Sequence, residues 1–66
     1  MQIILNGEKT EIANDTTAQA LIEQLGLVGR RLAMEVNQEL VLRSEYTEYK
    51  LQPGDQVEIV HAIGGG

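Results

Sequence analysis

An Asn-Gly pair at positions 6 and 7 separates two short runs of residues, Met1–Leu5 and Glu8–Ile12. Both central positions of a type I′ turn need a positive φ, so this pair is the strongest short-range signal for a β-hairpin. Pairing the two runs about the turn predicts which side chains share the buried face of the hairpin. They are Met1, Ile3, Leu5, Glu8, Thr10 and Ile12.

A short amphipathic helix is expected after the hairpin. Its apolar positions follow the i, i+3, i+4, i+7 spacing of one helical face. They are Ala18, Leu21, Ile22 and Leu25. Two threonines are candidate N-caps: Thr16 has Gln19 three residues later, as in a capping box, whereas Thr17 fits the apolar register better. Gly26 supplies a C-terminal stop.

The second half of the chain reads as short strands joined by turns. Pro53 and Gly54 occupy the two central positions of a type II turn, and Ser44 is expected to cap a single helical turn that runs to Tyr46. The predicted strands are Leu32–Val36, Glu39–Leu42 and Gln56–Ala62, with a turn at Asn37-Gln38. In the last strand, alternation turns Val57 and Ile59 toward the core and leaves Val60 and Ala62 on the other face.

These elements predict an α+β fold with a four- or five-stranded mixed sheet packed on one main helix. A right-handed crossover brings a later strand alongside the first. The chain has 66 residues, which is enough for one small domain but not for two. We expect a single domain over residues 1–63 and a flexible glycine tail over residues 64–66.

The composition counts against catalysis by side chains. The chain has one histidine, one serine and no cysteine, so we expect no catalytic residue and no metal site. His61 is interpreted as a packed or solvent-facing strand residue and Asp55 as a turn acid. The formal net charge of −5 disfavours nucleic acid and anionic membranes as partners. No apolar run approaches the length of a membrane span, and Met1–Asn6 lacks the basic flank of a secretory signal, so we expect a cytoplasmic protein.

The feature that carries chemistry is the final Gly64-Gly65-Gly66. Residues without β-carbons can thread a narrow channel and present the α-carboxylate of Gly66 to an enzyme. This carboxylate is ionised at neutral pH and is a poor electrophile, so acyl chemistry at Gly66 requires activation, for example as an adenylate formed with ATP and Mg²⁺. The outward apolar residues beside the tail suggest a docking patch. Its expected members are Val60, Ala62 and Ile63, with Leu40 or Leu42 as neighbours.

The chain resembles the ThiS-type sulfur carrier proteins of thiamin biosynthesis, which have the ubiquitin-like β-grasp fold. The resemblance covers the whole chain and is most specific in the stretch from Pro53 to Gly66. Met1-Gln2-Ile3 with Asn6-Gly7 and Val36-Asn37 also fit the family. The middle departs from it: Val41-Leu42-Arg43 stands where Val-Pro-Arg is usual, and Tyr46 where tryptophan is frequent.

The resemblance implies a carrier that is not itself an enzyme and binds no cofactor. A ubiquitin-activating-type adenylyltransferase is expected to adenylate Gly66 with ATP and Mg²⁺. Sulfur from a cysteine desulfurase persulfide then produces a thiocarboxylate, which donates sulfur to thiazole synthase. The alternatives are a carrier for molybdopterin synthesis or tRNA thiolation, a ubiquitin-like protein modifier, and an interaction module with an inert tail. An acidic carrier of this kind is also expected to be steered toward a basic, ATP-handling partner.

Overall fold

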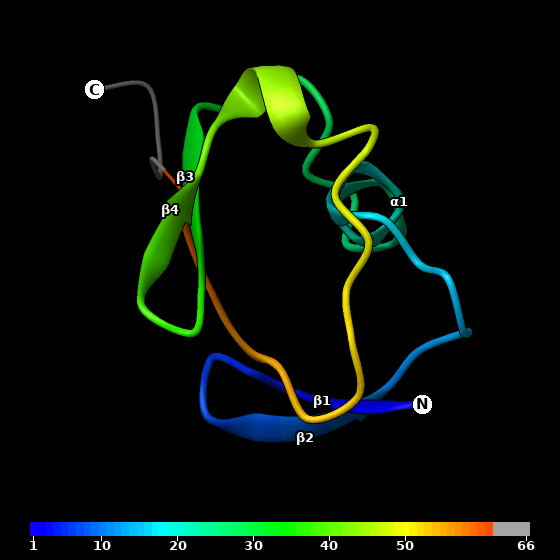
Figure 1. Cartoon of the computed structure of the whole chain (residues 1–66). Helices are drawn as coiled ribbons and strands as arrows, with labels where there is room; N and C mark the ends of the chain where they lie inside the picture. Colours follow the sequence, from blue (N-terminus) through cyan, green and yellow to red (C-terminus); the bar gives the residue numbers. More distant parts are fainter. Residues whose placement is uncertain (62–66) are drawn as a thin grey trace.

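The computed structural model of the chain describes residues 1–61, which form a mixed five-stranded sheet wrapped around one helix (Figure 1). The order of the strands across the sheet is β2-β1-β5-β3-β4, which confirms the predicted architecture. Within these residues, no helix is long and apolar enough to cross a membrane. The elements in chain order are β1 (Gln2–Leu5), β2 (Glu8–Glu11), α1 (Ala18–Gln24), β3 (Leu32–Val36), β4 (Glu39–Val41), the 3-10 turn η1 (Arg43–Glu45) and β5 (Gln56–His61).

The N-terminal hairpin has the predicted turn and register. Asn6 and Gly7 both have positive φ, at 48° and 85°. Ile3 pairs with Thr10, and the N–H of Ile12 donates to the carbonyl of Met1 at 2.8 Å. Because this register turns Ile3 and Ile12 to the helix side, both side chains are buried, as expected.

Thr17, and not Thr16, is the N-cap of α1. The Oγ1 of Thr17 accepts a hydrogen bond from the N–H of Ala20 at 3.1 Å, which satisfies one of the free donors of the first turn. Thr16 is buried, and its hydroxyl donates instead to the carbonyl of Ala13. The two adjacent threonines therefore have different roles, one in the helix and one in the loop before it.

The helix ends in a Schellman motif. Gly26 has a φ of +72°, its N–H donates to the carbonyl of Glu23, and the N–H of Leu27 donates to the carbonyl of Ile22 at 3.0 Å. This geometry corrects one core prediction: Leu25 is the C-cap and is 41% exposed. The chain reverses at Gly26, so Leu27 packs against the core in place of Leu25.

The middle of the chain differs from the prediction at two residues. Strand β3 has the predicted bounds, but β4 ends at Val41, one residue before the predicted end at Leu42. Ser44 lies inside η1 and does not cap it. The side chain that closes this turn is that of Glu45, whose carboxylate reaches back to accept from the N–H of Leu42 at 3.0 Å.

The Pro-Gly turn sets the direction of β5. Gly54 has a φ of +82° and the N–H of Asp55 donates to the carbonyl of Gln52, in agreement with the predicted type II turn. The N–H of Gly54 also donates to the carbonyl of Gln2 at 2.8 Å. Strand β5 therefore starts beside β1 and runs parallel to it, pairing Gln56 with Ile4.

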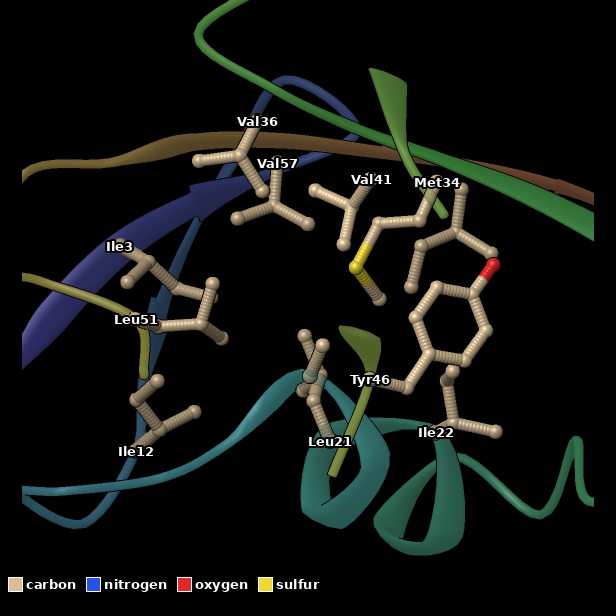
Figure 2. Close-up of a cluster of buried hydrophobic side chains, with 12 residues drawn as sticks. Ile3, Ile12, Leu21, Ile22, Met34, Val36, Val41, Tyr46, Leu51 and Val57 are labelled. Carbon is tan, nitrogen blue, oxygen red and sulfur yellow. The ribbon is translucent and has the colours of Figure 1, made fainter. Parts of the chain in front are cut away.

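The core is built almost entirely from aliphatic side chains (Figure 2). Its single aromatic residue, Tyr46, is 4% exposed. Val57 and Ile59 are buried as the alternation predicted, and the other buried apolar residues come from every element except β2 and η1. They are Ile3, Ile12, Ala18, Leu21, Ile22, Met34, Val36, Val41 and Leu51. The expected boundary between domain and tail, after residue 63, lies outside the described residues.

Candidate functional site

The candidate site is the end of β5 that leads into the terminal glycines. Strand β5 is the centre of the sheet, with β1 on one side and β3 on the other. His61 is its last described residue and precedes five further residues of the chain. The expected site residues Ala62, Ile63, Gly64, Gly65 and Gly66 lie outside the described part.

Two turn asparagines fasten β5 to its neighbours. The ladder between β1 and β5 ends at the pair of Leu5 and Val57, and the side chain of Asn6 continues it. Its Oδ1 accepts from the N–H of Ile59 at 2.8 Å and its Nδ2 donates to the carbonyl of Ile59 at 3.3 Å. Asn6 therefore acts as one more rung of the ladder, although it is 53 residues away from Ile59 in sequence.

Asn37 fastens the start of β5 from the other side. Its Oδ1 accepts from the N–H of Gln56 at 3.0 Å, and its Nδ2 donates to Asp55 at 3.0 Å. Asp55 also accepts from the N–H of Gln52 at 2.8 Å, so its predicted role as a turn acid is confirmed. From the sequence, both asparagines were predicted only as turn residues. The sequence does contain one signal for this role, because each asparagine is the first residue of a tight turn at the end of a strand.

An exposed apolar patch lies on the face of the sheet opposite α1. Its members are Val60, Leu40 and Leu42, which are 71%, 61% and 53% exposed, and we call them the outer patch. Val60 pairs with Ala33 across β5 and β3. Met34 pairs with Val41 in the antiparallel ladder of β3 and β4, so the next residue along the chain, Leu42, follows on the side of Ala33. Val60, Ala33 and Leu42 therefore lie in one row across the sheet. The prediction that Val60 faces outward is confirmed, and the expected neighbours Leu40 and Leu42 are exposed on the same face of the sheet.

Two carboxylates border the outer patch. Glu58 on β5 pairs directly with Glu35 on β3, and both side chains are exposed. Like charges in directly opposed positions destabilise a sheet by up to about 1 kcal/mol. Glu35 also pairs with Leu40, so the acidic pair adjoins the patch. This face of the protein therefore offers apolar contact bordered by negative charge.

His61 is the titratable residue nearest the tail in sequence. It follows Val57 and Ile59 on the helix side of β5, pairs with Leu32 and is half-buried. Its Nδ1 is buried and has no hydrogen-bond partner among residues 1–61. Over the same residues, no group of three or more His, Cys, Asp or Glu side chains is arranged to hold a metal ion. The described residues of this site therefore combine an exposed apolar patch, a pair of carboxylates and one half-buried histidine, without a cluster of metal-ligating side chains.

Comparison with known proteins gives a family match over almost the whole chain. The ThiS family model matches residues 3–66. The chain is 33% identical over 66 residues to the sulfur carrier protein ThiS of Escherichia coli (strain K12), and the match covers 100% of each chain. It also aligns with the crystal structure of the thiamine biosynthesis protein (ThiS) from Geobacter metallireducens, with a TM-score of 0.84, 25% identity and full coverage of both chains.

A different kind of relative is the thiazole synthase of Paramagnetospirillum magneticum (strain ATCC 700264 / AMB-1). The chain is 39% identical to it over 66 residues, which is 100% of this chain but 20% of that protein. The chain thus spans one fifth of the length of this relative. In that protein, a segment similar to this whole chain is part of a much longer polypeptide.

Proposed function

The chain belongs to the ThiS family, and from this membership we infer that it is a sulfur carrier of thiamin biosynthesis and not an enzyme. The observation that carries the proposal is the match to a sulfur carrier over the full length of both chains, glycine tail included. The geometry agrees with it. Strand β5 is the central strand of the sheet and carries Val60 of the outer patch, and Gly64, Gly65 and Gly66 follow it in the sequence.

The reactive group in this proposal is the α-carboxylate of Gly66. A carboxylate oxygen attacks the α-phosphorus of ATP in a partner adenylyltransferase that holds Mg²⁺, and pyrophosphate leaves. The acyl-adenylate is an electrophile, unlike the free carboxylate. A persulfide sulfur, supplied by a cysteine desulfurase, attacks the carbonyl carbon and displaces AMP. A thiol then reduces the resulting acyl disulfide, which leaves the thiocarboxylate on Gly66.

Thiazole synthase is the proposed acceptor of the sulfur. The likeness of the whole chain to one fifth of a thiazole synthase supports this partnership, because a similar segment is joined there to the enzyme itself. The carrier itself needs no bound cofactor for this chemistry. The cytoplasm supplies the ATP and the desulfurase persulfide that the reaction requires, and we place the protein there.

The outer patch is the proposed docking surface for these partners. Burying three aliphatic side chains that are more than half exposed stabilises a complex by roughly 25 cal/mol for each Å² of apolar surface removed from water. Glu35 and Glu58 then favour a partner with basic groups beside its apolar contact surface. Val60 is central to this surface, and Ala62 and Ile63 are proposed to extend it toward the tail.

Intact mass spectrometry tests the chemistry. The chain is incubated with ATP, Mg²⁺, a ubiquitin-activating-type adenylyltransferase that acts on ThiS carriers, a desulfurase and cysteine, and we expect its mass to rise by about 16 Da as sulfur replaces oxygen. A variant without Gly66 serves as the control and should keep its mass and its melting temperature. An unchanged mass of the wild-type chain, or stable adducts of the chain on lysines of other proteins, would contradict the proposal.

Paired serine variants test the docking surface. Val60→Ser should leave the stability within about 0.5 kcal/mol, because Val60 is 71% exposed, yet weaken the binding of the adenylyltransferase by about tenfold. Leu25→Ser is the matched control, since Leu25 is also exposed but lies at the end of α1, on the helix side of the sheet. Equal binding by the two variants would show that the outer patch is not the contact surface.

A further inference from the structure

A basic pocket lies near His61, the last described residue of β5. It is formed between the C-terminal end of α1, the loop that follows it, the start of β3 and η1, with a volume of about 160 Å³. In Figure 1 this loop and η1 lie at the same end of the molecule. Its lining includes the two arginines Arg30 and Arg43 and the largely apolar side chains of Ile22, Leu27, Leu32 and Tyr46.

The charge of this pocket is opposite to that of the chain. The net charge is −5, yet the lining contains two arginines and no acidic residue. Arg31, which follows Arg30, places three of the five basic residues in or beside the pocket. Within residues 1–61, these guanidinium groups form no salt bridge, and all three side chains are exposed. Among the described residues, these arginines thus present positive charge without a salt-bridge partner at one end of an acidic molecule.

The size of the pocket decides between two classes of ligand. Sites for nucleotides and other small-molecule ligands usually have volumes of about 300–1,000 Å³. A volume of about 160 Å³ is smaller than that range and suits one or two side chains. Val28, another lining residue, is 61% exposed and adds apolar surface at the mouth. The pocket therefore fits an apolar side chain of a protein with carboxylates on either side of it.

The pocket is also next to the last described residue of β5. Leu32, which lines the pocket, pairs with His61 across β3 and β5. A protein that receives the glycine tail is therefore brought close to Arg30 and Arg43. The pocket lies on the helix side of the sheet and the outer patch on the other, so such a partner contacts the carrier on two sides of β5.

We propose that this pocket, formed by the end of α1, η1 and Arg30 and Arg43, binds an acidic segment with an aliphatic anchor in the protein that receives the tail. The proposal rests on the proposed function, because it takes that protein to be a partner of the glycine tail. The proposal also refines the expectation, drawn from the net charge, that the partner is basic. The partner surface that meets the pocket is acidic, and its basic groups lie against Glu35 and Glu58 on the outer face of the sheet.

The test is a titration of the ¹⁵N-labelled chain, observed by NMR, with a short capped peptide of alternating leucine and glutamate. The same peptide with glutamine in place of glutamate is the probe without charge. We expect the acidic peptide to shift the amide signals of residues 27–32 and 43–46. Arg30→Gln with Arg43→Gln should weaken this binding about fivefold or more, because two charged contacts are lost.

Lys9→Gln with Lys50→Gln is the matched control. It lowers the net charge by the same amount but changes residues that do not line the pocket, so it should bind as the wild type does. Equal binding of the two peptides, equal binding of the two double variants, or shifts scattered away from the pocket would each overturn the proposal. Failure of the sulfur-carrier function appears in a separate measurement, the mass of the chain, so the two outcomes are distinguishable.

Discussion

Asn6→Gly tests whether a turn side chain holds the functional strand in place. Glycine keeps the positive φ of 48° that the turn requires but removes both hydrogen bonds to Ile59. Each bond of this kind contributes about 1 kcal/mol, so the free energy of unfolding should fall by about 2 kcal/mol. In a domain of this size, that loss lowers the melting temperature by roughly 10 °C.

The matched control is Gln38→Gly in the turn between β3 and β4. Gln38 also has a positive φ, of 70°, and within residues 1–61 its side chain makes no hydrogen bond. Glycine removes backbone strain there without the loss of a contact, so the stability should stay the same or rise by up to about 1 kcal/mol. The contrast between the two variants separates the hydrogen bonds from the effect of the turn conformation.

Hydrogen exchange gives a local measure of the same contact. In the wild type, the N–H of Ile59 donates to the Oδ1 of Asn6. Exchange of this amide should therefore speed up in Asn6→Gly and stay slow in Gln38→Gly. Stability of Asn6→Gly within about 0.5 kcal/mol of the wild type, together with a protected Ile59 amide, would refute the role assigned to Asn6.

Three further changes test other parts of the fold. Thr17→Ala should cost about 1 kcal/mol through the lost N-cap, and Thr17→Ser should restore most of it, as measured by urea unfolding. Glu35→Gln should stabilise the protein by up to about 1 kcal/mol, because it removes the like-charge pair with Glu58, and an unchanged midpoint would contradict this. Burial, and then the charges of Asp55, Glu39 and Glu45, raise the pKa of Tyr49 above its usual 10.0. The folded state therefore keeps this proton where the unfolded state loses it, so stability should fall as the pH rises above about 10, and Tyr49→Phe should lack this component.

Local signals in the sequence predicted most of the fold. The turns at Asn6-Gly7 and Pro53-Gly54 are specified by the φ values that their own residues permit, and the burial of Val57 and Ile59 follows from alternation along one strand. Leu25 was assigned wrongly because its burial depends on where the helix ends. The Schellman turn at Gly26 takes Leu25 off the buried face, and periodicity alone does not show this.

The features of the site that the sequence did not predict depend on contacts between residues far apart in the chain. The bond from Asn6 to Ile59 joins residues that are 53 positions apart, and no local pattern indicates it. The pocket at Arg30 and Arg43 likewise depends on how the loop after α1 packs beside η1. Val60, in contrast, was predicted to face outward, because strand alternation fixes the face of a side chain once the core residues are known.

Isotope labelling can follow the sulfur from carrier to product. The chain is first charged with ³⁴S from labelled cysteine, purified, and then mixed with thiazole synthase and its other substrates. We predict that the mass of the chain returns to its starting value, as oxygen replaces sulfur at Gly66, and that ³⁴S appears in the thiazole. Thiazole without ³⁴S, formed while the chain keeps its label, would contradict a sulfur carrier of thiamin biosynthesis.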